Sequence, residues 1–140
     1  MVDDRLNTVA EQLFNKIRGR FPNITIGDAD GNTTNVPSDA RFYDFEYADK
    51  GAVVGKVSCA LDPEKITIMY SDNLVGDEAE HDRQDWYNFL KGLRQFSRSR
   101  MLGFDVRNIN KDSNTRRDYK FLAANKLPES VDLENYIKNL

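Results

Sequence analysis

Three alternating segments in the middle of the chain limit what it can fold into. They read ARFYDFEYA, AVVGKVSCALD and KITIMYS, and in the first of them Tyr43, Phe45 and Tyr47 alternate with acidic residues. A period of two residues is that of a strand with one buried face. The links DKG and DPE are short enough for hairpins. The sequence therefore predicts an antiparallel meander with one covered face and one more polar face.

Two helices are expected to cover that meander. Asp3 or Asp4 can cap a first helix, whose apolar residues recur at helical spacing until Gly19. A longer helix is predicted from about Glu78 to Met101, with acids first and bases last, the order that the helix dipole favours. We expect an α+β fold in two layers, with a three- to four-stranded antiparallel meander packed on an N-terminal helix and a long C-terminal helix.

The remaining segments are assigned more coarsely. NITIG predicts a short strand, and DADGNTTNVPSDA predicts a turn-rich connection. GFDVRNINKDSNT is expected to break the long helix, TRRDYKFLAANKLP to form a shorter helix, and VDLENYIKNL to add a turn or two. Residues 1–127 are expected to form one domain, and residues 128–140 a tail or a short helix.

The chain has one cysteine, Cys59, and one histidine, His81. Neither an internal disulfide, nor a zinc site, nor a Cys–His nucleophile can be assembled from them. Cys59 stands in an apolar alternating run, so we interpret it as a small buried hydrophobe, with a reactive thiol as the alternative.

Two acidic stretches resemble metal sites. GDADGNTTN spaces Asp28, Asp30 and Asn32 as a calcium loop would, but Gly31 comes too early for the EF-hand pattern, so an Asp-Gly turn is the interpretation. The acids between residues 77 and 85 are explained by a helix start. No metal, cofactor or catalytic residue is expected, and an enzyme would need a pocket uniting Tyr43, Asp44, Asp85 and an arginine.

Charge is distributed unevenly along the chain. The net charge is −3 overall, but it is −8 over residues 1–85 and +5 over residues 86–140, with +6 in residues 91–120 alone. A basic half can attract phosphates or an acidic partner, and it can also complement the chain's own acidic half.

The helical arrangement of residues 86–101 separates an apolar face from a basic stripe. At about 100° per residue from Trp86, an apolar arc from about 280° to 60° contains Phe89, Leu90, Leu93, Phe96 and Met101. A neighbouring arc from about 80° to 140° contains Tyr87, Lys91, Arg94 and Arg98. Arg100 falls inside the apolar arc, so either the helix ends before it or it pairs with a carboxylate from another segment.

The basic stripe is the candidate binding surface. Together with the basic residues that follow it, it would track a phosphate backbone, with Tyr87 as the stacking side chain. The alternative is a solvated face with salt bridges to the acidic strands. The candidate partner-binding or nucleic-acid-binding residues are Tyr87, Lys91, Arg94, Arg98, Arg107, Lys111, Arg116, Arg117 and Lys120.

The N-terminal residues MVDDRLNTVAEQLF carry acids and lack the apolar centre of a secretory signal peptide. No apolar stretch approaches the roughly 20 residues that span a bilayer. Neither secretion by a signal peptide nor a membrane partner is therefore expected.

A further signal is carried by residues 86–126, WYNFLKGLRQFSRSRMLGFDVRNINKDSNTRRDYKFLAANK, and by the earlier IGDADGNTTNVPSDARFYDFEY. In order and in several short strings, these motifs resemble segments of uncharacterised proteins of tailed bacteriophages, especially phages of marine bacteria. The resemblance covers most of residues 23–126 and implies a phage protein, without any catalytic residue to transfer. Those proteins extend well beyond the motif, so whether this chain is a whole short protein or one domain of a longer one stays open.

These observations favour a phage-encoded, non-enzymatic protein that serves as a virion-structural or protein-interaction module. Its partner is expected to be a phage or host protein or a second copy of itself, in the virion or in the cytoplasm of the infected host cell. The alternative is a nucleic-acid-binding protein that holds DNA or RNA on the basic surface of residues 86–120.

Overall fold

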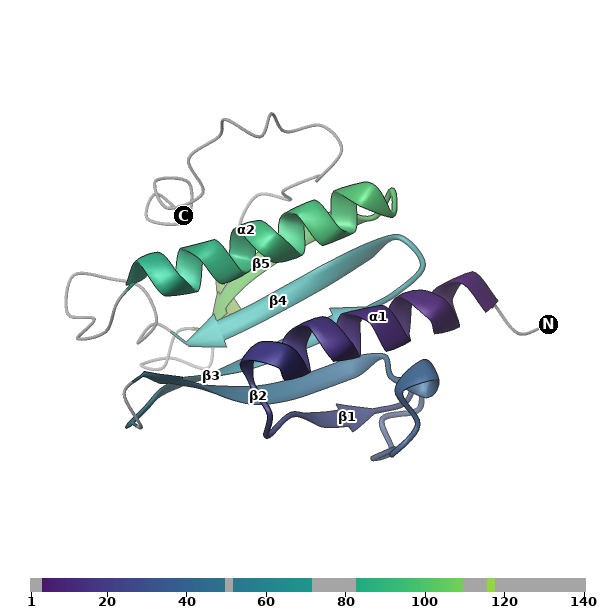
Figure 1. Ribbon diagram of the computed structural model, residues 1–140, viewed down its shortest axis with the longest axis horizontal. Coiled ribbons are helices and arrows are strands. Elements are labelled where there is room, and N and C mark those ends of the chain that lie inside the picture. The colour runs from purple at the N-terminus through teal and green to yellow at the C-terminus, as the bar shows by residue number, and fades with distance from the viewer. Residues whose placement is uncertain (1–3, 50–51, 72–82, 110–115, 118–140) are drawn as a thin grey trace.

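The computed structural model describes residues 4–49, 52–71, 83–109 and 116–117. Two helices, α1 (Asp4–Arg20) and α2 (Arg83–Ser99), pack on one face of a six-stranded sheet (Figure 1). The strands are β1 (Thr25–Gly27), β2 (Phe42–Asp49), β3 (Ala52–Leu61), β4 (Lys65–Ser71), β5 (Gly103–Ile109) and β6 (Arg116–Arg117). A short 3-10 helix, η1 (Pro37–Asp39), lies between β1 and β2.

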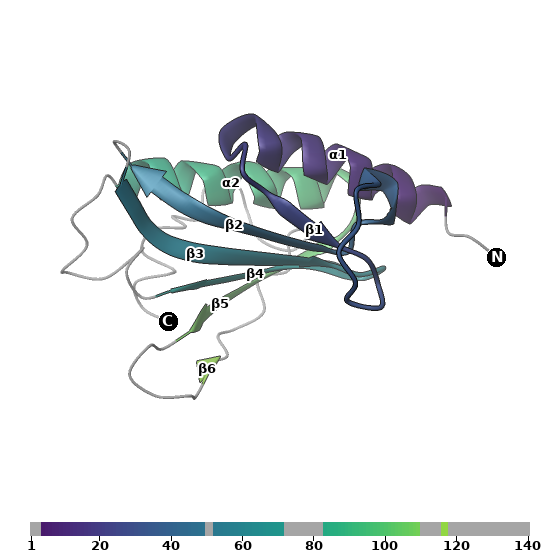
Figure 2. The ribbon, with the colours of Figure 1, turned by 90° about the horizontal axis from the view of Figure 1, so that it is seen from below.

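The order of the strands across the sheet is their order along the chain. Neighbouring strands pair antiparallel from β1 to β4, β5 pairs parallel with β4, and β6 returns antiparallel to β5. The parallel pair requires a crossover, which α2 provides. Figure 2 shows both helices on the same side of the sheet. The predicted α+β class and the two layers are confirmed, but the sheet is mixed and has more strands than the three or four predicted.

The strand β5 was not predicted, because its residues were assigned to a break after the long helix. The segment does leave the helix, but it then pairs along its whole length with β4, from Gly103 beside Lys65 to Ile109 beside Ser71. Its Phe104 and Val106 are buried on the helix side of the sheet. The shorter helix predicted from residue 115 is also wrong at its start, where Arg116 and Arg117 form β6. Its remainder, and the predicted tail, lie outside the described residues.

The core lies between the helices and one face of the sheet. On α1 the predicted apolar stripe is buried, with Leu6, Val9, Leu13 and Ile17 turned inward. Such side chains contribute roughly 1.5–3 kcal/mol each on burial. The sheet contributes alternate residues, as the period of two predicted: Tyr43, Phe45, Tyr47, Val57, Cys59, Leu61, Ile66, Ile68, Tyr70, Phe104 and Val106.

The predicted apolar face of α2 is also largely confirmed. Trp86, Leu90, Leu93 and Phe96 are buried, and Phe89 packs against the core at its margin. The Trp86 ring lies 5.5 Å from the ring of Tyr47 and stacks on Phe89 at 5.9 Å. Trp86 also lies 5.6 Å from the ring of Tyr70, so this aromatic group joins the first turns of α2 to β2 and β4.

The end of α2 departs from the helical projection. The helix stops at Ser99, where the N–H of Leu102 donates to the carbonyl of Ser97 at 2.9 Å and the N–H of Met101 donates to Arg98 at 3.1 Å. These two bonds form a Schellman motif, in which the residue after the helix takes a left-handed conformation. That residue is Met101, with φ of 58° and a side chain that is 80% exposed, so its predicted place in the apolar face is wrong.

Arg100 lies beyond the helix end, as one of the two predicted alternatives required. Its guanidinium stacks on the ring of Phe96, 3.6 Å from the centroid, and its Nε donates to Gln12 on α1 at 2.8 Å. Partial desolvation lowers the pKa of this guanidinium from its ordinary value. Arg100 therefore joins the two helices.

Candidate interaction surface

The predicted basic stripe of α2 is only partly on the surface. The buried arc of the helix extends beyond the apolar residues and includes Tyr87, which is fully buried, and Arg94, which is 4% exposed. Their predicted position on an exposed binding face is therefore wrong. Lys91 is half-buried and Arg98 is exposed, so these two define what remains of the stripe on α2.

The other predicted basic residues lie elsewhere. Arg107 is on β5, next to the inward-facing Val106, so it points to the sheet face opposite the helices. Arg116 and Arg117 form β6 at the same edge of the sheet. Lys111 and Lys120 lie outside the described residues. The structure thus divides the predicted site between a helix on one face and the β5–β6 edge.

Arg107 takes part in a charged group on the open sheet face. The carboxylate of Asp105, whose side chain is 4% exposed, accepts from Arg107 at 3.1 Å and from the Lys65 Nζ at 3.4 Å. Removing one carboxylate from water costs several kcal/mol, and two cations close by compensate much of that cost. We interpret the group as a structural bridge between β4 and β5.

The other half of the open face, on β2, is acidic and exposed. Asp44 and Glu46 both face away from the helices and are exposed. The Oγ of Ser58 donates to Asp44 at 2.6 Å, and Lys56 is the cross-strand neighbour of Glu46. The first edge of the sheet therefore presents carboxylates, whereas the far edge carries arginines.

The edge of β2 is only partly covered. β1 has three residues and pairs with Phe42, Tyr43 and Asp44. Among the described residues, no strand continues that pairing along the second half of β2, up to Asp49. Figure 1 shows this half of β2 extending past the start of β1. Within the described ranges, the backbone groups on this side of the second half of β2 lack a neighbouring strand, and such an edge can pair with an added strand.

Sequence reasoning missed a cluster that joins both helices to β2. Arg20, at the end of α1, forms a 2.5 Å ion pair with Asp85 in the first turn of α2, and the hydroxyl of Tyr47 donates to the same carboxylate oxygen. The hydrogen bond to Asp85 raises the pKa of Arg20. The Arg20 cation balances the charge of the Asp85 carboxylate, and the Tyr47 hydroxyl donates a hydrogen bond to it. We interpret this cluster as a structural link between the three elements. Only the position of Asp85 near a helix start was visible in the sequence.

The pocket that an enzyme would need is not formed by the residues named for it. Tyr43 is buried under α1, where its hydroxyl donates to the carbonyl of Ala10 at 3.1 Å. Asp44 follows it on the opposite face of the sheet, and Asp85 instead meets Arg20 and Tyr47. The predicted combination is therefore divided between the two sides of β2.

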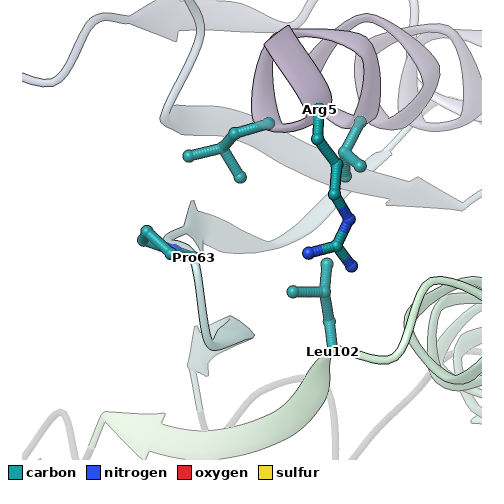
Figure 3. A pocket seen from close by; sticks show the side chains of 5 residues that line it. Arg5, Pro63 and Leu102 are labelled. Carbon is teal, nitrogen blue, oxygen red and sulfur yellow. The ribbon is translucent and has the colours of Figure 1, made fainter. Parts of the chain in front are cut away.

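A small hollow lies at the other end of the molecule, between α1, the β3–β4 turn and the start of β5 (Figure 3). It is lined by Arg5, Leu6, Val9, Pro63 and Leu102 and has a volume of about 10 Å³. That is room for roughly one water molecule. The Arg5 guanidinium is fixed there by the carbonyl of Arg100.

The Asp28 loop is a turn, as predicted. Asp28 accepts hydrogen bonds from the N–H groups of Asp30 and Asn32, both at 3.0 Å, and Gly31 has a φ of 86°. The carboxylate thus serves its own loop. Within the described ranges, no three His, Cys, Asp or Glu side chains come close enough to share a metal ion.

Cys59 is buried in the core, as predicted. Burial raises the pKa of its thiol, and the nearby Asp44 adds to the shift. A neutral, enclosed thiol packs as an apolar side chain.

No family model matches the chain, and neither a curated protein nor a solved structure matches it. Neither of the helices that the structure describes has the length and apolar character to cross a bilayer.

Proposed function

We propose that the protein is a phage-encoded, non-enzymatic module that binds another protein, in or on the virion or in the infected cell. The phage assignment rests on the resemblance of residues 23–126 to tailed-phage proteins. The interaction role rests on how the fold distributes charge and on the half of β2 that has no neighbouring strand among the described residues.

One observation carries the interaction role: strand order copies chain order, so an uneven charge along the sequence becomes an uneven charge across the sheet. Residues 21–49, with β1 and β2, contain six Asp or Glu and one Arg, a net charge of −5. Residues 103–117, with β5 and β6, contain four Lys or Arg and two Asp, a net charge of +2. Opposite charges at opposite edges favour oriented docking.

The nucleic-acid alternative receives less support. Its stacking residue, Tyr87, and one of its cations, Arg94, are in the core. A third residue, Arg107, is engaged with Asp105. Lys91 and Arg98 remain on α2, whereas Arg116 and Arg117 lie on β6 at the edge of the sheet, so the described cations do not form the single stripe predicted.

The experiment is a pull-down with tagged full chain from cells infected with the phage that encodes it, together with immunoblotting of purified particles. We expect a specific phage or host protein in the eluate, or the chain itself in the particles. A gel shift with single-stranded DNA, duplex DNA and RNA at low salt is the control for the alternative. A chain that is absent from particles, captures no protein and shifts nucleic acid would overturn the proposal.

A further inference from the structure

We propose that the uncovered half of β2 binds an extended, basic segment of a partner protein, which joins the sheet as an additional strand. The inference deepens the proposed function and rests on it. It names the binding edge and the chemistry of the partner.

The direction of the backbone groups follows from the pairing of β1. The carbonyl of Ile26 accepts from the N–H of Thr34 at 3.1 Å, so Ile26 faces away from β2. Ile26 stands opposite Tyr43, whose N–H and C=O must then face β3. Alternation along β2 turns the N–H and C=O of Glu46 toward the uncovered edge, and those of Ala48 by the same rule.

The shift in register near Tyr47 leaves this edge intact. Tyr47 is opposite Gly55 while Ala48 is opposite Val53, so the extra residue is in β3. β2 itself runs without interruption from Phe42 to Asp49. Its two outward residues offer four backbone groups with the spacing that an added strand requires.

The side of the edge beneath the helices is already filled. The ring of Phe21 stacks on Phe45 at 4.6 Å and lies 5.5 Å from Tyr47, and all three side chains are buried. The edge therefore offers backbone pairing rather than an apolar pocket. Selectivity for a partner must come from the open face, where Glu46 is exposed on the uncovered half of β2, one alternation beyond Asp44, which pairs with β1.

The carboxylates decide between a second copy and a basic partner. Two copies joined by the uncovered halves of their β2 strands would bring Glu46 toward Glu46 of the other copy. Like charges opposite one another on a sheet are destabilising, whereas opposite charges stabilise the pairing of the strands. A strand with Lys or Arg at alternate positions places a cation beside Glu46 and its backbone along β2.

The test uses fluorescently labelled peptides of about eight residues and the full chain, with binding read by anisotropy at low and moderate salt. The basic probe has Lys at every second position and Val or Thr between. Two further probes are its acidic counterpart, with Glu for Lys, and the basic peptide N-methylated on alternate backbone nitrogens. We expect the basic probe alone to bind, and more weakly as salt rises.

Two matched variants locate the site on the protein. Glu46→Lys should weaken binding of the basic probe by roughly tenfold. Glu64→Lys, the same reversal in the exposed β3–β4 turn, should leave binding unchanged. Circular dichroism and the fluorescence of Trp86, the one tryptophan of the chain, verify that both variants are folded.

Three results would overturn the inference: no binding of the basic probe at low salt, equal binding of the N-methylated probe, or equal weakening by both variants. Sedimentation of the chain alone tests the other occupant, because self-association that an excess of the basic probe abolishes would assign the edge to a second copy. A further result would be a specific pull-down partner that binds the Glu46→Lys variant and the native chain equally tightly. That result would support the proposed function and would assign the binding to a surface other than β2.

Discussion

Met101 occupies a backbone conformation that favours glycine. Its φ of 58° places it at the left-handed position of the Schellman motif, and its side chain is mostly in solvent. The left-handed conformation costs a non-glycine residue roughly 1–2 kcal/mol, part of which the greater freedom of unfolded glycine offsets. Met101→Gly should therefore raise the free energy of unfolding by up to about 1 kcal/mol, as measured by urea denaturation.

The control for this prediction is Met101→Ala, which removes the exposed side chain and keeps the backbone cost. We expect its stability to stay close to that of the native chain. If the alanine and glycine variants raise the free energy of unfolding equally, the left-handed conformation of Met101 is not the cause of the gain.

Cys59 makes stability depend on alkaline pH. Burial raises the pKa of its thiol in the folded protein, whereas in the unfolded chain the thiol ionises near pH 8.5. A raised folded pKa stabilises the fold fully below the unfolded pKa and progressively less above it. The free energy of unfolding should fall as pH rises past about 8.5, by at most about 1.4 kcal/mol per pH unit for this group.

Cys59→Ala removes this contribution, so its unfolding free energy should change less between about pH 8 and 9.5. Above about pH 10 both proteins should lose stability, because burial also raises the pKa of Tyr43. Parallel pH curves below pH 10, followed by urea denaturation, would contradict the role assigned to the thiol.

At the scale of elements, the contact of Arg20 and Tyr47 with Asp85 joins α1, α2 and β2. The Arg20 and Asp85 side chains are 43% and 44% exposed, so solvent screens their attraction. Asp85→Asn should lower the free energy of unfolding by about 1 kcal/mol or less. Glu11→Gln, which neutralises an exposed acid on α1, is the matched control and should have a smaller effect.

A double-mutant cycle isolates the pair. Arg20→Gln and Asp85→Asn should show a coupling of a few tenths of a kcal/mol to about 1 kcal/mol, and it should shrink with added salt. Zero coupling at low salt would mean that the ion pair contributes nothing to the docking of the helices.

The elements that local periodicity describes were predictable. Apolar residues at helical spacing indicated α1 and α2, and alternation across two short links indicated β2, β3 and β4. β5 gave a weaker signal, the alternation of Phe104 and Val106 around Asp105, directly after a helix-breaking glycine. β5 pairs parallel with β4, and a helix separates the two strands along the chain. No short hairpin link therefore indicated this pairing in the sequence.

The candidate surface was harder to predict for a related reason. The helical projection orders side chains by angle, but the width of the buried arc depends on what the helix packs against. On α2 that arc is about 180° and includes Arg94 and Tyr87. The pairing of Arg20 with Asp85, and the uncovered half of β2, both depend on contacts between distant segments.

At the scale of the whole molecule, the protection of backbone amides against hydrogen exchange should decrease from the middle of the sheet to its edges. β3 and β4 have a strand on each side, whereas β1 has three residues at the margin. Amide hydrogen exchange followed by NMR should be slowest in β3 and β4 and fastest in β1. Within β2, Glu46 and Ala48 should exchange faster than Phe45 and Tyr47; similar rates at all four would contradict the uncovered edge.

The agreement between strand order and chain order has a consequence for biosynthesis. As the polypeptide leaves the ribosome, β2, β3 and β4 each meet a neighbour that has already emerged, so the sheet can grow in one direction as it is translated. β5 differs, because the crossover helix separates it from β4 along the chain and it emerges well after its neighbour. The antiparallel part is thus available as a template before the basic end of the chain has been made.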